Sequence, residues 1–213
     1  MFFVFDGMDG TGKSTQLDLF VQWLQEQDHD VVVCRDPGST ELGIQLRELL
    51  LQERGLPIHM RSELLMFISA RAQVTEEVIR PALEAGKTVV CDRYVLSTVV
   101  YQGYGGDIDP NQVWRLNYFA TNGVAADLTF VFDLEPEIAL SRLGDNLDRL
   151  ESRGTEYFER LRFGFTEECK RFPIGYDLID ASGSIEEVQQ RVRAAANVCL
   201  SKEDKASNAN RES

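Results

Sequence analysis

Short apolar runs alternate along the chain with longer segments in which apolar residues recur at helical spacing. The short runs are typical of strands buried on both faces of a parallel sheet, and they cover 2–5, 31–34, 88–91, 128–132 and 176–179. The longer segments predict helices at 13–27, 41–51, 61–85, 155–170 and 184–200. Such alternation predicts an α/β fold in which helices cover both faces of a parallel sheet of about five strands.

The ends of these segments predict one domain over residues 1–200. Ser184 is the expected N-cap of the last helix, and Glu186 and Glu187 suit its first turn. Residues 201–213 (SKEDKASNANRES) contain no large apolar residue and predict a disordered tail. Two further segments predict mobile loops, because 102–110 is rich in glycine and 142–154 is dense in charge.

Composition narrows the function classes. The formal charge is −13, with 35 acidic against 22 basic residues, and an acidic surface disfavours binding to nucleic acid. No apolar run reaches the roughly 18 residues that cross a bilayer, and the segment before Asp6 is too short for a secretory signal. We therefore expect a cytoplasmic protein. The four cysteines form no CxxC pair and are interpreted as ordinary thiols.

A phosphate-binding loop follows the first predicted strand directly. The segment matches GxxxxGK[ST] and reads Gly7-Met8-Asp9-Gly10-Thr11-Gly12-Lys13-Ser14-Thr15. Its glycines let successive backbone N–H groups turn toward one concavity, at the positive end of the following helix. Lys13 is expected to reach the β- and γ-phosphates of ATP, and the Ser14 hydroxyl to bind Mg²⁺. The sequence therefore predicts a nucleotide phosphate site.

Two strand ends compete for the position that faces the magnesium ion. Asp92 follows one apolar run and Asp133 another, and Asp92 is the assigned ligand. Arg93 comes directly after Asp92, where the ligand crevice of a parallel sheet lies, and its fork geometry suits a phosphate. The alternative is that Asp92 and Arg93 form only a structural ion pair. A second phosphate binder opposite Lys13 favours an acceptor that already carries phosphate.

These residues carry a family resemblance. The segment 92–103 (DRYVLSTVVYQG) resembles the signature of thymidylate kinases, and the same order of features runs along almost the whole chain. Around it lie the P-loop and three weaker matches: Arg35-Asp36-Pro37-Gly38, Leu64-Leu65-Met66-Phe67 with Ala70-Arg71, and Asp148-Arg149-Leu150-Glu151. Asp36 stands where the family usually has Glu, and Ser39 where Gly is common.

The resemblance implies a three-layer P-loop NTPase fold and the phosphorylation of dTMP to dTDP by Mg·ATP in DNA-precursor synthesis. It also implies a homodimer. One alternative is a kinase for another nucleoside monophosphate or for a deoxynucleoside, although the paired Arg35 and Arg93 favour a phosphorylated acceptor. A P-loop module that binds nucleotide without turnover is an alternative of a different class.

The resemblance also assigns the acceptor pocket. Phe67 would stack on the thymine ring and Arg71 would donate to a base carbonyl, although Phe67 equally suits core packing. Arg35 and Arg93 would hold the acceptor phosphate. Asp9 would face the 3′-hydroxyl, unless it is only a solvated loop aspartate. The remaining substrate-binding residues are Ser97, Thr98 near the base, Tyr101 near the sugar, where its ring could exclude a 2′-hydroxyl, and Gln102.

Catalysis is expected to rest on alignment and charge neutralisation, because phosphoryl transfer needs little covalent help from the protein. The predicted catalytic residues are Lys13, Asp9, Arg93 and Arg149. Residues 8–11 of the P-loop are not basic, so the resemblance points to a catalytic arginine in the lid, at 142–154. Arg149 is the first candidate, with Arg142 and Arg153 as further ATP contacts; surface ion pairs are the alternative for all three.

Overall fold

The protein contains a fully parallel sheet of five strands. The computed structural model describes residues 1–51, 57–144 and 148–209. The strand order is β2-β3-β1-β4-β5, and every pairing is parallel. All five predicted strands are present, as β1 (Phe2–Gly7), β2 (Val31–Arg35), β3 (Thr88–Asp92), β4 (Leu128–Asp133) and β5 (Tyr176–Asp180).

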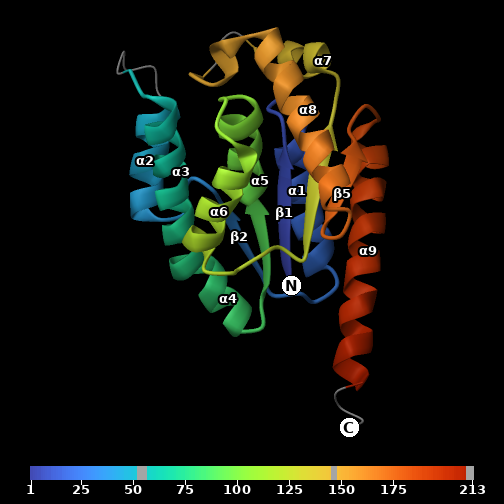
Figure 1. Ribbon diagram of the computed structural model, residues 1–213. Coiled ribbons are helices and arrows are strands. Elements are labelled where there is room, and N and C mark those ends of the chain that lie inside the picture. Colours follow the sequence, from blue (N-terminus) through green and yellow to red (C-terminus); the bar gives the residue numbers. More distant parts are fainter. Residues whose placement is uncertain (52–56, 145–147, 210–213) are drawn as a thin grey trace.

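Helices cover both faces of the sheet, which confirms the predicted three layers (Figure 1). The α-helices are α1 (Lys13–Gln25), α2 (Glu41–Leu51), α3 (Met60–Val74), α4 (Arg80–Glu84), α5 (Val95–Thr98), α6 (Pro110–Thr121), α7 (Pro136–Ser141), α8 (Thr155–Arg171) and α9 (Ile185–Ala209). Helices α1 and α9 pack together on one face; α4, α5 and α8 contact strands from the other, with α3 and α6 packed outside α5.

Three short helical segments complete the described chain. Two are π-helical, η1 (Thr75–Ile79) and η2 (Val99–Tyr104), and η3 (Glu151–Arg153) is a 3₁₀ turn. Segment η1 joins α3 to α4, so the single helix predicted over 61–85 contains an interruption. Segment η2 carries two predicted acceptor residues, and π-helical turns are frequent at functional sites.

The prediction that all strands are buried on both faces is wrong for the two edge strands. Strands β1, β3 and β4 are almost entirely buried. Val33 of β2 and Leu178 of β5, however, expose 50% and 43% of their surface. Both strands lie at an edge of the sheet, where fewer elements cover them. Apolar composition reports the mean burial of a strand and does not distinguish a central strand from an edge strand.

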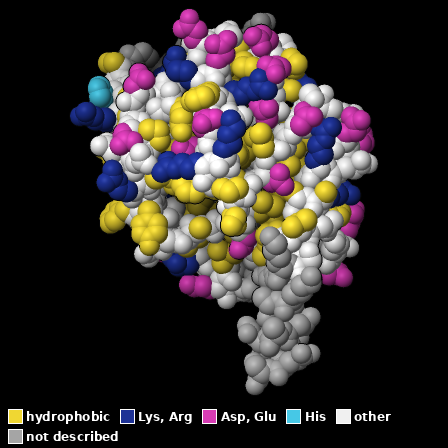
Figure 2. Space-filling view, turned by 45° about the vertical axis from the view of Figure 1, so that its right-hand side comes forward, with side chains coloured by type: hydrophobic (Ala, Val, Ile, Leu, Met, Phe, Trp, Pro, Cys, Tyr) yellow, Lys and Arg dark blue, Asp and Glu magenta, His cyan; other side chains and the backbone are white. Residues whose placement is uncertain are grey.

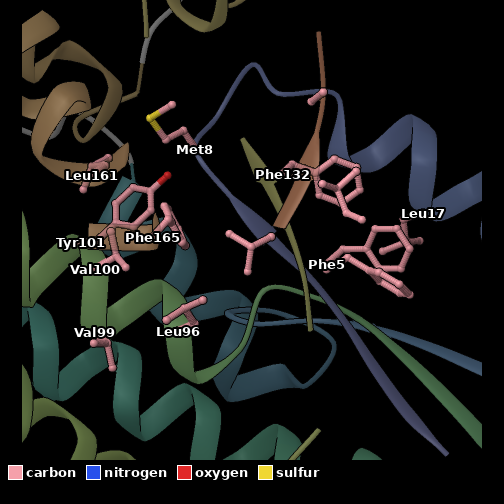
Figure 3. Close-up of a cluster of buried hydrophobic side chains, with 14 of the residues drawn as sticks. Phe5, Met8, Leu17, Leu96, Val99, Val100, Tyr101, Phe132, Leu161 and Phe165 are labelled. Carbon is pink, nitrogen blue, oxygen red and sulfur yellow. The ribbon is translucent and has the colours of Figure 1, made fainter. Parts of the chain in front are cut away.

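The hydrophobic core lies on both sides of β1. Figure 3 shows Phe5 and Phe132 with Leu17 on one side of this strand and Tyr101 and Phe165 on the other. The rings of Phe5 and Phe132 stack with centroids 5.7 Å apart. Burying one such side chain contributes roughly 1.5–3 kcal/mol. The core therefore holds the carboxyl end of β1, and with it the start of the P-loop, in a fixed position.

The segment 102–110, which its glycines predict to be a mobile loop, is helical over its first three residues and forms a turn only after Tyr104. Gln102 lies in η2 and is 1% exposed. Asp109 ends the segment as the N-cap of α6, because its side chain accepts a hydrogen bond of 3.0 Å from the backbone N–H of Asn111.

The C-terminal helix begins as predicted and continues beyond its predicted end. The backbone N–H of Glu187 donates to Ser184 Oγ at 3.3 Å, and the Ser184 N–H donates to Glu187 Oε2 at 2.8 Å, which forms a capping box. Helix α9 then runs to Ala209, through most of the predicted tail, and projects past the lower end of the sheet (Figure 1). Residues 210–213 of that tail and 145–147 of the predicted lid lie outside the described residues.

Candidate active site

The P-loop joins β1 to α1 and packs closely against its neighbours. Gly10 has φ +79°, and a Cβ atom there would lie 2.1 Å from the Ala139 carbonyl oxygen. Gly7 has φ +132°, and its Cβ would lie 2.6 Å from the Phe132 carbonyl oxygen. Both positions require glycine for backbone conformation and for space. The loop is therefore held between β4 and α7 in a conformation that a side chain at either glycine would disturb.

Lys13 lies at the first position of α1 and is 7% exposed. Its Nζ donates to the Met8 carbonyl at 2.6 Å and lies 3.9 Å from Asp9 Oδ1. Burial and the nearby Arg93 guanidinium lower the pKa of Lys13 to about 8, although neighbouring aspartates oppose that shift. Binding of a polyphosphate would therefore stabilise the charged form of Lys13.

A first cavity opens beside the P-loop. Its lining residues are Asp9, Gly10, Gly12, Lys13, Ser14, Thr15, Arg35, Arg47, Asp92, Arg93, Arg142, Leu143 and Glu151. Of the predicted ATP-binding residues, Gly7, Met8, Thr11 and Arg153 do not line it. Thr11 supports the loop from within, because its hydroxyl donates to the Met8 carbonyl at 2.8 Å. We call this cavity the donor pocket.

The two aspartates that compete for the magnesium-facing position are separated by the structure. Asp92 lines the donor pocket together with Ser14. Asp133 lies outside it and accepts two hydrogen bonds from Arg162, at 2.7 and 3.0 Å. Asp92 is also paired, with Arg35 at 2.7 Å. No group of three or more His, Cys, Asp or Glu side chains suited to hold a metal occurs among the residues that the structure describes.

A second cavity lies beside the first and holds every predicted substrate-binding residue except Arg35. Its lining residues are Asp9, Asp36, Pro37, Arg47, Leu51, Phe67, Arg71, Arg93, Ser97, Thr98, Tyr101, Gln102, Asp148 and Leu150. We call it the acceptor pocket. It shares Asp9, Arg47 and Arg93 with the donor pocket. Charged groups therefore stand where the two cavities meet.

Arg93 is the centre of that junction. Its backbone adopts φ +68°, and its guanidinium donates to the Gly7 carbonyl at 2.9 Å, to Ser97 Oγ at 3.0 Å and to the Tyr101 hydroxyl at 3.2 Å. It also donates to Asp9. A left-handed backbone at a non-glycine residue is uncommon and often marks a functional site. Figure 3 shows the Tyr101 hydroxyl pointing toward the P-loop residue Met8.

Asp9 is held as an anion at the same junction. Burial opposes its charge, but Arg93, Lys13 and a hydrogen bond of 2.7 Å from the Tyr101 hydroxyl outweigh that cost. The pKa of Asp9 is consequently far below its usual range. The interpretation of Asp9 as a solvated loop residue is therefore not supported.

Arg71 is fully buried at the wall of the acceptor pocket. Its Nε donates to Asp36 Oδ2 at 2.5 Å, and its Nη1 donates to Thr98 Oγ1 at 2.6 Å and to Asn117. The other carboxylate oxygen, Asp36 Oδ1, and the side-chain oxygen Gln102 Oε1 are buried without a hydrogen-bond partner in the described part of the chain. The pocket therefore presents both donors and unsatisfied acceptors.

Arg47 is a site residue that the sequence analysis did not identify. It lies on α2, lines both pockets and donates to the Pro37 carbonyl at 3.3 Å. Burial and the neighbouring Arg35 lower the pKa of Arg47. The signal available in the sequence was weak: Arg47 is the only basic residue of the segment ELGIQLRELLL. Arg35 itself lines only the donor side, and its side chain is 48% exposed.

The structure places the three arginines of the predicted lid at two different positions. Arg142 lies at the P-loop, with Nη1 3.5 Å from the Gly10 carbonyl. Arg149 and Arg153 line neither pocket and instead donate to the buried carboxylate of Glu63, at 2.6 and 2.9 Å. A contact of Arg149 with ATP requires that this pairing be broken, and its catalytic role stays a prediction.

Comparisons with known proteins agree with this geometry. The family model for thymidylate kinase matches residues 5–192. A thymidylate kinase of Exiguobacterium sp. is 46% identical over 194 residues, covering 90% of this chain and 92% of that protein. One of Gloeobacter violaceus is 41% identical over 204 residues, with 94% and 96% covered. The crystal structure of thymidylate kinase from Ehrlichia chaffeensis superposes with a TM-score of 0.77 at 33% identity, covering 92% and 98%. The chain belongs to the thymidylate kinase family.

Proposed function

We propose that the two adjoining pockets perform the thymidylate kinase reaction, with ATP in the donor pocket and dTMP in the acceptor pocket. Membership of the family assigns the activity, the phosphorylation of dTMP to dTDP. The observation that carries the proposal is the shared boundary of the pockets, where Asp9, Arg47 and Arg93 meet the P-loop. In-line phosphoryl transfer needs two phosphates held against each other with cations between them.

On the donor side, Lys13 and the P-loop amides bind the ATP phosphates. Ser14 and Asp92 would hold Mg²⁺, because a hydroxyl and a carboxylate in one pocket match the oxygen ligands that this ion prefers. When bound, Mg²⁺ neutralises the charge that develops on the transferred phosphoryl group. Arg142 is placed to contribute a further cation beside the loop.

On the acceptor side, Phe67 stacks on the base and Arg71 donates to a base carbonyl. Gln102 Oε1 is a buried acceptor without a partner in the described chain. The N3–H group is the only hydrogen-bond donor on the thymine ring, so it matches this oxygen. Thr98 and Asn117 fix the Arg71 guanidinium. The thymine methyl adds only about 1 kcal/mol of apolar burial, so dUMP would be rejected weakly.

The sugar and phosphate of the acceptor fall near the junction. Tyr101 and Asp9 are tied to each other at 2.7 Å, and this pair is assigned to the deoxyribose. Ser97 positions Arg93 for the acceptor phosphate, through a hydrogen bond of 3.0 Å. Arg47 is assigned to the same phosphate, and Arg35 reaches it on release from Asp92. A neutral nucleoside acceptor would offer no phosphate to this cluster of three arginines, which disfavours the deoxynucleoside kinase alternative.

The test is ADP release in a coupled assay with Mg·ATP and a panel of acceptors. We expect dTMP to give the highest kcat/KM, dUMP to follow within about tenfold, and ribonucleoside monophosphates and thymidine to give at least about 10³-fold less. A preference for another monophosphate would refute the pocket assignment. An absence of turnover with every acceptor would favour the alternative of a nucleotide-binding module.

A homodimer, which the resemblance implies, has a suitable surface in the structure. Helices α3 and α6 pack against each other and expose large apolar side chains: Leu65 (53%), Leu116 (38%), Tyr118 (74%) and Phe119 (85%). Figure 2 shows one face of the molecule, on which apolar side chains gather in patches between charged ones. We expect Phe119→Asp to convert a dimer to a monomer in sedimentation; a monomeric wild type would refute this proposal.

The cytoplasmic location inferred from the sequence stays a prediction. Within the part of the chain that the structure describes, no helix has both the length and the apolar character needed to cross a membrane.

A further inference from the structure

Glu63 is a buried carboxylate that none of the assignments above uses. It lies in the first turn of α3 and has no exposed surface. Its Oε1 accepts a hydrogen bond of 2.7 Å from Gln102 Nε2, and its Oε2 accepts from Arg149 Nη2 at 2.6 Å and from Arg153 Nη2 at 2.9 Å. One oxygen therefore contacts Gln102, which lines the acceptor pocket, and the other contacts two arginines of the predicted lid.

The two arginines make this burial possible. A buried carboxylate is costly unless it is paired and hydrogen-bonded, and here two guanidinium groups match its charge. Arg149 is fixed further by a bond of 2.8 Å from its Nε to the Leu50 carbonyl, and Arg153 by a bond of 3.2 Å to the Tyr157 hydroxyl. A carboxylate that is paired with two guanidinium groups in this way accepts hydrogen bonds and donates none.

This restriction decides how the Gln102 amide is oriented. An amide group can face a neighbour with either its NH₂ group or its oxygen, and the hydrogen-bond network selects between them. Because Glu63 only accepts, the NH₂ group must point toward Glu63. The side-chain oxygen of Gln102, a residue that lines the acceptor pocket, then points away from Glu63, and it has no hydrogen-bond partner in the described chain.

We propose that Glu63, paired with Arg149 and Arg153, is a specificity-determining positioning residue that makes the acceptor pocket require a ring N–H group on the base. The inference rests on the proposed function. A base whose ring nitrogen has lost its proton would place an acceptor against Gln102 Oε1, which costs binding. Thymine satisfies the requirement through N3–H.

The decisive variant is Glu63→Gln. The two arginines require an acceptor, so they keep the amide oxygen of the new side chain and leave its NH₂ group facing Gln102. Gln102 then accepts from that group and turns its own NH₂ toward the pocket. The hydrogen-bonding polarity of the pocket is thereby inverted, with almost no change in side-chain volume.

The probe is 5-bromo-dUMP, in which bromine replaces the thymine methyl at similar size and makes N3–H more acidic. The measurement is kcat/KM for 5-bromo-dUMP divided by kcat/KM for dTMP, between pH 7 and pH 9. Ionisation of Lys13, whose pKa is about 8, affects both substrates and cancels in this ratio. The charged and titratable groups around Glu63 are Arg149, Arg153 and Tyr157, and those that line the acceptor pocket with Gln102 are Asp9, Asp36, Arg47, Arg71, Arg93, Tyr101 and Asp148. Their ionisation affects both substrates and cancels in the same way.

In the wild type we expect the ratio to fall above the N3 pKa of 5-bromo-dUMP, by up to about tenfold per pH unit, as the loss of one proton requires. In Glu63→Gln the ratio should stay level or rise, and KM for dTMP should increase at least about tenfold. A pH dependence identical to the wild type in Glu63→Gln would overturn the proposal. Failure of the wild type to phosphorylate dTMP would instead refute the proposed function.

Two further variants serve as controls for this experiment. Arg149→Met leaves Arg153 on Glu63, so it should keep the wild-type pH dependence of the ratio, whatever its kcat. If Glu63→Gln does not fold, the triple variant Glu63→Met/Arg149→Met/Arg153→Met replaces the buried charges by apolar groups, an exchange that proteins often tolerate. It frees the Gln102 amide, so the ratio should lose its pH dependence there too; a ratio that still falls as in the wild type contradicts the proposal.

Discussion

Lys13→Met is expected to lower kcat by at least about 10³-fold while the protein stays folded. Among the residues that the structure describes, Lys13 is the one lysine that lines the donor pocket, and it is almost fully buried. A group that neutralises the transferred phosphoryl in a low-dielectric site contributes far more there than in water. Methionine keeps most of the side-chain length and removes the charge together with the N–H donors of the ammonium group.

The rate is measured by coupled ADP release at saturating dTMP, and folding by circular dichroism. Lys87→Met is the matched control, because Lys87 is 40% exposed and pairs at 3.0 Å with Asp30, which is more exposed still. Surface pairs of this kind contribute little, so that variant should retain full activity. A Lys13 variant with the same kcat as the control would contradict the assignment of the P-loop to ATP.

Arg93→Met is expected to lower kcat/KM by at least about 10³-fold and also to destabilise the fold. The guanidinium is the cation at the junction of the two pockets, and it is the partner of Asp9 and lies 3.5 Å from the buried Asp6. Removing one member of a buried charged group typically costs about 3–5 kcal/mol of unfolding free energy, because the remaining charges are left unpaired. Activity and thermal unfolding should therefore both change.

A second variant separates the two effects. Arg93→Met/Asp9→Asn removes one unpaired carboxylate, so it should recover part of the lost stability and none of the lost activity. Arg80→Met is the matched control, since Arg80 pairs with the half-exposed Glu76 on one helical surface at 2.8 Å. Recovery of activity in the double variant would show that Arg93 acts on Asp9 alone and not on the acceptor phosphate.

Local pattern was sufficient for the strands and the P-loop, whereas the acceptor residues of the signature segment were assigned by the family resemblance. The alternation of short apolar runs with segments of helical periodicity predicts a sheet covered by helices. The segment 92–103 begins at the carboxyl end of the interior strand β3, so its first side chains lie at the carboxyl edge of the sheet. The P-loop likewise depends on the strand before it and the helix after it, and both are contiguous in the sequence.

Contacts between residues far apart in the sequence could not be predicted from local pattern. The resemblance placed Arg149 at ATP, yet the folded chain pairs it with Glu63, which lies 86 residues away. Arg47 and Asn117 each come from a helix outside any motif, and they reach the site only because α2 and α6 pack against α3. The glycines of 102–110 indicated a loop, whereas packing buries Gln102 in η2.

The difference between the features that the sequence predicted and those that it did not has a physical cause. Backbone periodicity, glycine-dependent loop geometry and strand-end positions depend on neighbours in the sequence, so the chain specifies the α/β fold and the phosphate site through local rules. The direction of a buried side chain depends instead on which donors and acceptors surround it after folding. The orientation of the Gln102 amide, the partners of the lid arginines and the charge state of Asp9 are consequently properties of the tertiary structure.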